Sequence, residues 1–256
     1  MKLKAIIFDV DGTLADTEEA HRQAFNAAFR EAGLPWNWSK PQYAELLLTT
    51  GGKERIAAYL KSLDLADGER RTLSARIADL HKAKTGHYMR IVSAGEVPLR
   101  EGVVRLLDEA RDAQLPLAIA TTTTAANIEA LLRTTLGDDA LARFAVIGAG
   151  DQVVHKKPAP DIYELVLQKL ELAADDCVAI EDSANGLTAA KAAGIFTIVT
   201  PSYWTQSENF AAADLLLPSL GSAARPLTHR AAQLIGGGVL GIREIDKQLV
   251  AARLYA

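Results

Sequence analysis

The chain has 256 residues, of which 49% are hydrophobic and 23% are charged, with a formal net charge of -4 at pH 7. This length is sufficient to bury a full hydrophobic core, either in one large α/β domain or in a core with an inserted domain. The slightly acidic balance excludes an overall positive field, so we expect neither nucleic acid nor an anionic membrane as a partner.

The cysteine content favours a reducing compartment, and the hydropathy of the sequence predicts neither a signal peptide nor a membrane span. Cys177 is the only cysteine, so an internal disulfide framework is excluded. The apolar run after Lys4 is interrupted at Asp9 and is too short for the hydrophobic region of a signal peptide. No stretch approaches the roughly 18 apolar residues that a membrane span requires. We therefore expect a soluble, cytoplasmic monomer with no obligate protein partner.

Short apolar runs alternate with helical patterns along most of the chain. The runs that predict buried strands are 4–10, 115–121, 145–148, 177–181, 195–200 and 215–217. The segments with helical periodicity between them are 102–113, 125–135, 160–170 and 184–193. Continuous apolar strands that alternate with helices predict an α/β fold, a doubly wound (Rossmann-like) parallel sheet covered on both faces.

The alternation is interrupted once, where residues 17–32, 41–49, 53–63 and 68–90 show only helical periodicity. Asp16 and Glu19 have the spacing of a capping box at the start of the first segment. We predict a core of residues 1–14 and 93–256 with an inserted all-helical, four-helix cap domain at 15–92. The alternative is a single domain that carries a helical hairpin. Residues 220–256 form a C-terminal extension of unassigned role, with an amphipathic helix at 242–254.

Polar groups follow several of the predicted strands. They are Asp9 and Asp11 after the first strand, Thr121, Thr122, Thr123 and Thr124 after the second, Lys157 after the third, and Glu181 and Asp182 at the end of the fourth. Each taken singly is typical of a commoner feature: a turn, β-propensity, a solvated helix start or an N-cap. Because ligands bind beyond the carboxyl ends of strands in such a sheet, we expect these groups to converge on one site.

This set of residues fits phosphoryl transfer. The carboxylates of Asp9, Asp11 and Asp182 would repel one another unless a hard cation neutralised them, and oxygen ligands suit Mg²⁺. One carboxylate can attack phosphorus, and a second can protonate the leaving oxygen and later deprotonate water. A threonine hydroxyl and a lysine ammonium can hold the non-bridging oxygens.

The motifs IFDVDGT, the strand ending in Thr121, Lys157 before proline, and Glu181-Asp182 resemble the four signature motifs of the haloacid dehalogenase superfamily. The resemblance implies that Asp9 is the nucleophile, Asp11 the general acid/base, and Thr121 and Lys157 the phosphate-holding residues. It also implies Mg²⁺ bound by Asp9, the backbone carbonyl of Asp11 and Asp182, with Glu181 in a supporting position. The helical insert resembles the cap of the β-phosphoglucomutase-like branch.

Longer stretches, among them FDVDGTLADTEEAH, TTGGKERI and AIEDSANGL, are similar to the CbbY-like proteins of Calvin-cycle operons. That family is associated with removing phosphate from xylulose 1,5-bisphosphate, an inhibitor of Rubisco, to give xylulose 5-phosphate. The resemblance implies a sugar phosphate as the small-molecule substrate. Expected substrate-binding residues are Glu18, His21, Gly52, Lys53, Arg55, Thr122, Thr123 and Thr124.

Three alternatives remain open at the level of sequence. The first is a phosphosugar mutase of the same branch, and the second is a phosphatase of another small sugar phosphate. The third, from a different class, is a non-catalytic regulatory module on the same fold. A phosphonate hydrolase is disfavoured because Lys53, the candidate for its Schiff base, lies beside Glu54 and Arg55 in a setting that looks solvated.

Overall fold

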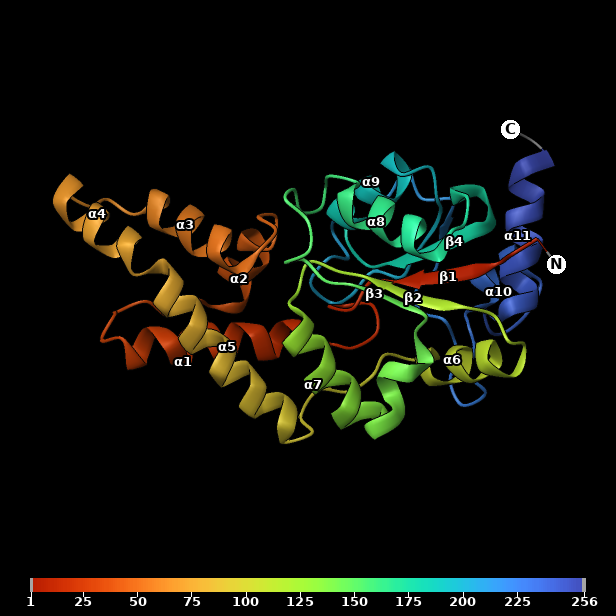
Figure 1. Cartoon of the computed structure of the whole chain (residues 1–256), viewed down its shortest axis with the longest axis horizontal. Coiled ribbons are helices and arrows are strands. Elements are labelled where there is room, and N and C mark those ends of the chain that lie inside the picture. Colours follow the sequence, from red (N-terminus) through yellow and green to blue (C-terminus); the bar gives the residue numbers. More distant parts are fainter. Residues whose placement is uncertain (1, 255–256) are drawn as a thin grey trace. The chain divides into compact units, whose positions relative to one another are not determined.

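Six parallel strands form one sheet in the computed structural model, which describes residues 2–254 (Figure 1). The strand order is β3-β2-β1-β4-β5-β6. This confirms the predicted doubly wound sheet. The strands are β1 (Ala5–Phe8), β2 (Leu117–Ala120), β3 (Val146–Gly148), β4 (Cys177–Glu181), β5 (Phe196–Val199) and β6 (Leu215–Leu216).

Both faces of the central strands are buried, which explains why β1 reads as a continuous apolar run. Ala5 and Ile7 belong to a core cluster that includes residues of α8 (Asp161–Leu170) and α9 (Ala184–Ala192). Ile6 and Phe8 are also fully buried, on the other face, because successive side chains of a strand alternate. Figure 1 shows α6 (Val103–Asp112) and α7 (Ala125–Leu136) on that second face.

The direction in which the chain adds strands reverses between β1 and β4. From β1 the chain builds β2 and β3 on one side, and then β4, β5 and β6 on the other. Phe8 of β1 pairs with Ile180 of β4, and the Asp9 N–H donates to the Ile180 carbonyl at 3.0 Å. Ligands of open α/β sheets bind at such a reversal point, so the residues after β1 and β4 lie where a site is expected.

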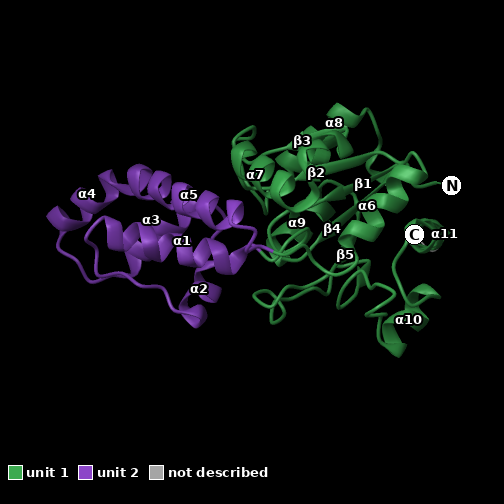
Figure 2. Ribbon diagram, turned by 90° about the horizontal axis from the view of Figure 1, so that it is seen from below, with its two compact units in different colours: residues 1–16, 98–256 green, residues 17–97 purple. Residues whose placement is uncertain are grey.

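The chain divides into two compact units: residues 17–97 form one, and the residues before and after them form the other (Figure 2). The helices of residues 17–97 are α1 (Glu18–Glu31), α2 (Lys40–Leu46), α3 (Gly52–Ser62), α4 (Asp67–Ala75) and α5 (Ile77–Ser93). The segment 68–90, predicted as one helix, is two helices that meet at Arg76. We call residues 17–97 the cap unit and the remainder the core unit.

The predicted capping box at Asp16 and Glu19 is wrong. The N-cap residue of α1 is Thr17, which has a helical backbone and makes no side-chain cap hydrogen bond. Glu19 instead binds Arg22 on the next turn, and the nearest cation to Asp16 is Arg100 Nε, at 3.5 Å. The carboxylates of both residues are thus used by arginines rather than by the helix start.

An aromatic cluster forms the core of the cap unit. Trp38 is fully buried, and its ring centroid lies 4.7 Å from that of Phe25 and 4.8 Å from that of Phe29. Large aromatic side chains bury much apolar area each, which allows a unit of about eighty residues to hold a core of its own.

The C-terminal extension is joined to the core unit by directed hydrogen bonds. It contains α10 (His229–Ile235) and α11 (Ile242–Leu254), and short 3₁₀ helices occur earlier at η1 (Asp138–Arg143) and η2 (Ala174–Asp176). Asp246 of α11 accepts from the Leu3 N–H at 2.9 Å, and Arg105 of α6 donates to the Leu220 and Leu240 carbonyls. The extension therefore supports the start of β1 and one face of α6.

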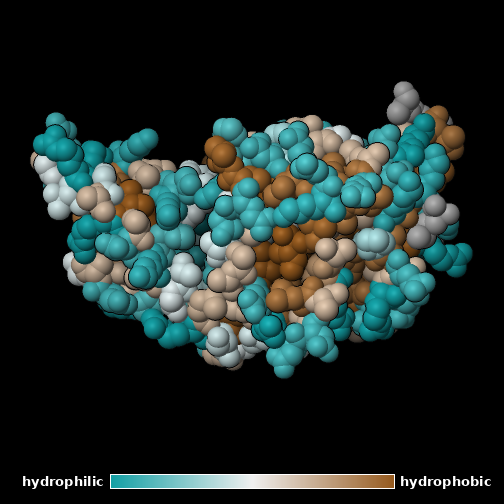
Figure 3. Space-filling view, viewed as in Figure 1, coloured by the Kyte–Doolittle hydropathy of each residue, from teal (hydrophilic) through white to brown (hydrophobic). Residues whose placement is uncertain are grey.

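The sheet has an open edge at β3, which pairs only with β2 among the described strands. Val146 and Ile147 on this strand are half-buried. Figure 3 shows hydrophobic side chains gathered near the position of β2 and β3.

No helix within residues 2–254 has the length and apolar character needed to cross a bilayer.

Candidate active site

Three buried carboxylates lie together where β1 and β4 end. Asp9 follows β1, and Glu181 and Asp182 stand at the end of β4. One carboxylate oxygen from each of the three lies within 4.8 Å of those of the other two. All three side chains are buried, with Glu181 at 0% exposure. Carboxylates removed from water at this separation must be neutralised, either by a nearby cation or by binding a proton.

Lys157 supplies part of that compensation. Its Nζ lies 2.7 Å from Asp9 Oδ1, 2.6 Å from Glu181 Oε1 and 2.8 Å from the Ala120 carbonyl at the end of β2. The three ammonium protons are thus directed to three acceptors, one from each of the neighbouring strand ends. Thr121, which follows Ala120, is buried as well.

The electrostatic balance of the site is set by burial. Burial raises the pKa of Asp9 to about 7, although Lys157 lowers it, and the charges of Glu181 and Asp11 add to the rise. Burial also raises the pKa of Asp182 well above its usual value, with further contributions from Asp9 and Glu181. Burial alone would lower the pKa of Lys157, but the neighbouring carboxylates outweigh it and raise the pKa. One lysine therefore does not neutralise the cluster.

The carboxylate cluster fits a hard divalent cation. Glu181 Oε2 is buried and has no hydrogen-bond partner within residues 2–254. Gly12, in the loop after β1, has φ of +81°, and a Cβ there would lie 2.2 Å from Asp182 Oδ2. The loop backbone thus comes directly against the carboxylate. Carboxylate and backbone carbonyl oxygens are the ligands that Mg²⁺ takes in proteins.

In the run of four threonines after β2, the hydroxyls of Thr121 and Thr123 accept hydrogen bonds, and those of Thr122 and Thr124 differ from them. Thr121 Oγ1 accepts from the Thr123 N–H at 3.3 Å, and Thr123 Oγ1 accepts from Asn127 at 3.1 Å. Thr124 is the N-cap residue of α7 and makes no side-chain cap bond, and Thr122 is half-buried. The hydroxyls of Thr121 and Thr123 thus have defined positions at the end of β2.

Several residues that contact the site belong to none of the motifs or strand ends from which the site was predicted. Tyr163 of α8 donates to Glu181 Oε1 at 2.5 Å. Thr205 Oγ1 lies 3.3 Å from Asp182 Oδ2. Arg100 donates to the Gly12 carbonyl and to the Thr200 carbonyl, and so ties the loop after β1 to the end of β5. The helical periodicity of α8 predicts that Tyr163 is buried. It does not predict which group the Tyr163 hydroxyl binds.

The expected substrate residues Glu18 and Arg55 lie in the cap unit and share one partner. Tyr43 donates from its hydroxyl to Glu18 at 2.7 Å and accepts from Arg55 at 3.0 Å. Arg55 also donates to the Leu46 carbonyl, and its side chain is largely buried. Arg55 therefore stabilises the junction of α2 and α3, whereas Lys53 is exposed.

His21 and Gly52 occupy crowded positions in the same unit. The ring of His21 stacks on Tyr88 at 4.0 Å between centroids, and its Nδ1 lies 2.6 Å from Nζ of the buried Lys84. A Cβ on Gly52 would lie 2.4 Å from His81 Nε2, so a larger residue at the start of α3 would have to displace the His81 ring. His21 is thus an oriented, buried side chain rather than a surface histidine.

Comparisons with known proteins agree with this geometry. Residues 3–194 match the family of haloacid dehalogenase-like hydrolases. The chain is 53% identical to CbbY of Cupriavidus necator over 225 residues, which cover 88% of this chain and 89% of that protein. It is 52% identical to CbbY of Rhodobacter capsulatus, covering 88% of this chain and 96% of that protein.

A solved structure gives the same result in three dimensions. A CbbY variant from Rhodobacter sphaeroides in complex with xylulose 1,5-bisphosphate superimposes with a TM-score of 0.79 and 49% identity, covering 87% of this chain and 98% of that one. A β-phosphoglucomutase from Clostridium difficile, at 19% identity and a TM-score of 0.72, shares the fold. The chain therefore belongs to the haloacid dehalogenase-like hydrolases, in their CbbY-like group.

Proposed function

We propose that this hydrolase removes phosphate from xylulose 1,5-bisphosphate to give xylulose 5-phosphate, with Mg²⁺ as its cofactor, and so protects Rubisco from inhibition. The observation that carries the proposal is the buried cluster of Asp9, Glu181, Asp182 and Lys157 at the reversal point of the sheet. The substrate is inferred from the likeness to CbbY, which binds xylulose 1,5-bisphosphate in its solved complex.

In the proposed reaction, Asp9 attacks phosphorus, and the bond from phosphorus to the sugar oxygen breaks. Asp11 gives its proton to that oxygen, and the product is an aspartyl phosphate on Asp9. Asp11 then takes a proton from water as the water oxygen attacks the acyl phosphate, which releases inorganic phosphate and restores Asp9.

Other side chains orient these groups. Lys157 orients Asp9 through Oδ1 and favours its ionised form. Thr121 and Lys157 are assigned to the non-bridging phosphate oxygens. Mg²⁺, held by Asp9, Asp182 and the Asp11 carbonyl with Glu181 in support, would offset the charge shared by the carboxylates and the phosphate.

The second phosphate of the substrate requires a further anion site, which we assign to the start of α3. Gly52 and Lys53 begin this helix, the positive end of a helix dipole favours an anion, and Lys53 adds an exposed ammonium. Arg55 is assigned a positioning role because two of its donors are bound within the cap unit. Glu18, His21, Thr122, Thr123 and Thr124 remain candidates for the sugar hydroxyls.

The deciding assay measures products from a panel of sugar monophosphates and bisphosphates with and without Mg²⁺. We expect Mg²⁺-dependent release of one phosphate per xylulose 1,5-bisphosphate and the highest kcat/KM for that compound. An isomerised phosphosugar without free phosphate would establish the mutase alternative. Preference for another sugar phosphate would replace the substrate, and binding without turnover would favour a regulatory module.

The anion site at α3 is tested with Lys53→Gln, using Lys61→Gln near the end of the same helix as the matched control. We expect KM for the bisphosphate to rise about tenfold, which corresponds to roughly 1.4 kcal/mol. KM for a small sugar monophosphate should change little. Equal losses on both substrates would show that Lys53 does not bind the second phosphate.

A further inference from the structure

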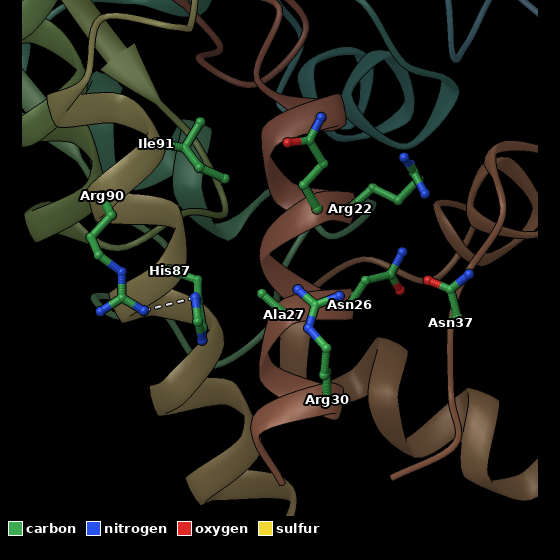
Figure 4. A pocket seen from close by; sticks show the side chains of 9 residues that line it. Arg22, Asn26, Ala27, Arg30, Asn37, His87, Arg90 and Ile91 are labelled. Carbon is green, nitrogen blue, oxygen red and sulfur yellow. Dashed lines mark hydrogen bonds between the residues drawn. The ribbon is translucent and has the colours of Figure 1, made fainter. Parts of the chain in front are cut away.

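The surface of the cap unit contains a pocket of about 570 Å³ that no step of the proposed reaction uses. It is lined by α1, by α5 and by the segment between α1 and α2 (Figure 4). The lining residues are Arg22, Gln23, Asn26, Ala27, Arg30, Asn37, His87, Arg90 and Ile91. All nine belong to residues 17–97, so the pocket is complete within the cap unit.

The lining is cationic. It contains three arginines and one histidine, and none of the nine residues is acidic. Two carboxylates bind members of the set from outside it: Glu19 pairs with Arg22, and Glu31 lies 2.7 Å from His87 Nε2. After these two negative charges are counted against the three guanidinium groups, one positive charge remains in excess even with a neutral histidine.

One side of the pocket is rigid. Arg22 donates to both oxygens of Glu19 and to the Trp38 carbonyl at 2.7 Å. Asn26 is buried and exchanges two hydrogen bonds with the backbone of Trp38. Because Trp38 lies in the aromatic core of the cap unit, this side of the pocket is held by the fold itself.

The other side keeps donors available. Within residues 2–254, the guanidinium group of Arg30 makes neither a hydrogen bond nor an ion pair. Arg90 uses one nitrogen, Nη2, to donate to His87 Nδ1 at 2.7 Å. Figure 4 shows Arg90 and His87 projecting from α5, and the guanidinium of Arg30 directed along α1 toward Asn26. Two guanidinium groups with unused donors thus face a pocket that contains no competing carboxylate.

We propose that this pocket binds a small phosphorylated metabolite. A guanidinium matches two oxygens of a phosphate group, and a phosphate dianion suits two such groups better than one. The amides of Gln23 and Asn37 can serve hydroxyls, and Ala27 and Ile91 offer a short apolar contact for a carbon chain. The residues involved are separate from every residue assigned to catalysis or to substrate.

The test is an NMR titration of the ¹⁵N-labelled protein in a Mg²⁺-free buffer, with glycerol 3-phosphate as the probe. We expect saturable shifts of the side-chain Nε–H resonances of Arg30 and Arg90 below about 10 mM probe. Arg30→Gln and Arg90→Gln should each raise the dissociation constant at this pocket at least about tenfold. Arg71→Gln, at an exposed position on α4, is the matched control and should leave it unchanged.

Two further measurements distinguish a phosphate site from a catalytic role of these arginines and from a site for any anion. Turnover of a small sugar monophosphate by Arg30→Gln and Arg90→Gln should equal that of the parent protein, because neither residue serves the reaction. Malate, a dicarboxylate of similar size, should bind at least about tenfold more weakly than glycerol 3-phosphate. Equal binding of malate, the absence of saturable shifts, or shifts retained in both variants would each overturn the proposal.

Discussion

The hydroxyl of Tyr163 lies 2.5 Å from Oε1 of Glu181, the same oxygen that accepts from Lys157. Burial raises the pKa of Tyr163 well above its usual value, and the charges of Glu181 and Asp9 add to the rise. The phenol therefore stays protonated and donates to the carboxylate. The Lys157 ammonium also lies 5.1 Å from the centroid of the tyrosine ring, so one side chain contacts both partners of the ion pair.

Tyr163→Phe should keep the ring and remove only this donor. We expect the Mg²⁺ concentration for half-maximal activity to rise about 10- to 100-fold, because Glu181 loses a group that orients it. The free energy of unfolding should fall by about 1–3 kcal/mol. Activity titrated against Mg²⁺ and urea denaturation measure the two effects. Tyr59→Phe, in the cap unit, controls for loss of a phenol, and an unchanged Mg²⁺ dependence in Tyr163→Phe would contradict the positioning role.

Asp9→Asn should reduce turnover at least about 10³-fold, because an amide cannot form the acyl phosphate. The protein should remain folded, since asparagine is nearly isosteric and removes one of three crowded charges. Phosphate release under saturating substrate and Mg²⁺ is the measurement. Asp138→Asn, at a side chain that is 95% exposed, is the control and should retain full activity. Full activity in Asp9→Asn would exclude this residue as the nucleophile.

Addition of Mg²⁺ to the metal-free protein should release protons. Burial raises the pKa of Asp9 to about 7, so this carboxyl is largely protonated below pH 7 without a cation. A bound dication favours the ionised form, and its binding therefore displaces the proton. The contribution of Asp9 should be present below pH 7 and should decline as the pH rises through 7. Calorimetry in buffers of different ionisation enthalpy counts these protons, and no release at pH 6 would mean that the cation does not bind at Asp9.

Gly186→Ala should disturb the site through a steric contact. A Cβ at this position of α9 would lie 1.9 Å from Oε2 of Glu181. This overlap can be removed only if the Glu181 carboxylate moves away from the helix. We expect a large loss of kcat and a lower melting temperature. Gly86→Ala, in α5, meets nothing within 4 Å and should raise the free energy of unfolding by about 0.5–1 kcal/mol with activity retained. Similar behaviour of the two variants would show that Glu181 is not held against Gly186.

Patterns within one element and the convergence of the strand ends on one site were predictable, but the individual side-chain contacts between distant elements were not. The strand at Ala5–Phe8 could be predicted because both of its faces are buried, which leaves an uninterrupted apolar run. Arg100 was missed because its acceptors at Gly12 and Thr200 lie 88 and 100 positions away. The charge of Arg55 led us to expect a substrate-binding residue, but it gave no indication that Arg55 donates to Tyr43 and to the Leu46 carbonyl of α2.

By itself, the sequence determined which chemical groups stand at the ends of the strands, and its motifs were sufficient to indicate the family. These properties are local, because a strand period or a motif is complete within a few neighbouring residues. Only the tertiary structure decided that Lys157 bridges Asp9 and Glu181, that Tyr163 shares the same oxygen, and that three arginines surround a pocket in the cap unit. Such contacts depend on how packed elements bring together residues that are far apart in the chain. The local preferences of a few neighbouring residues do not determine which distant residues will meet.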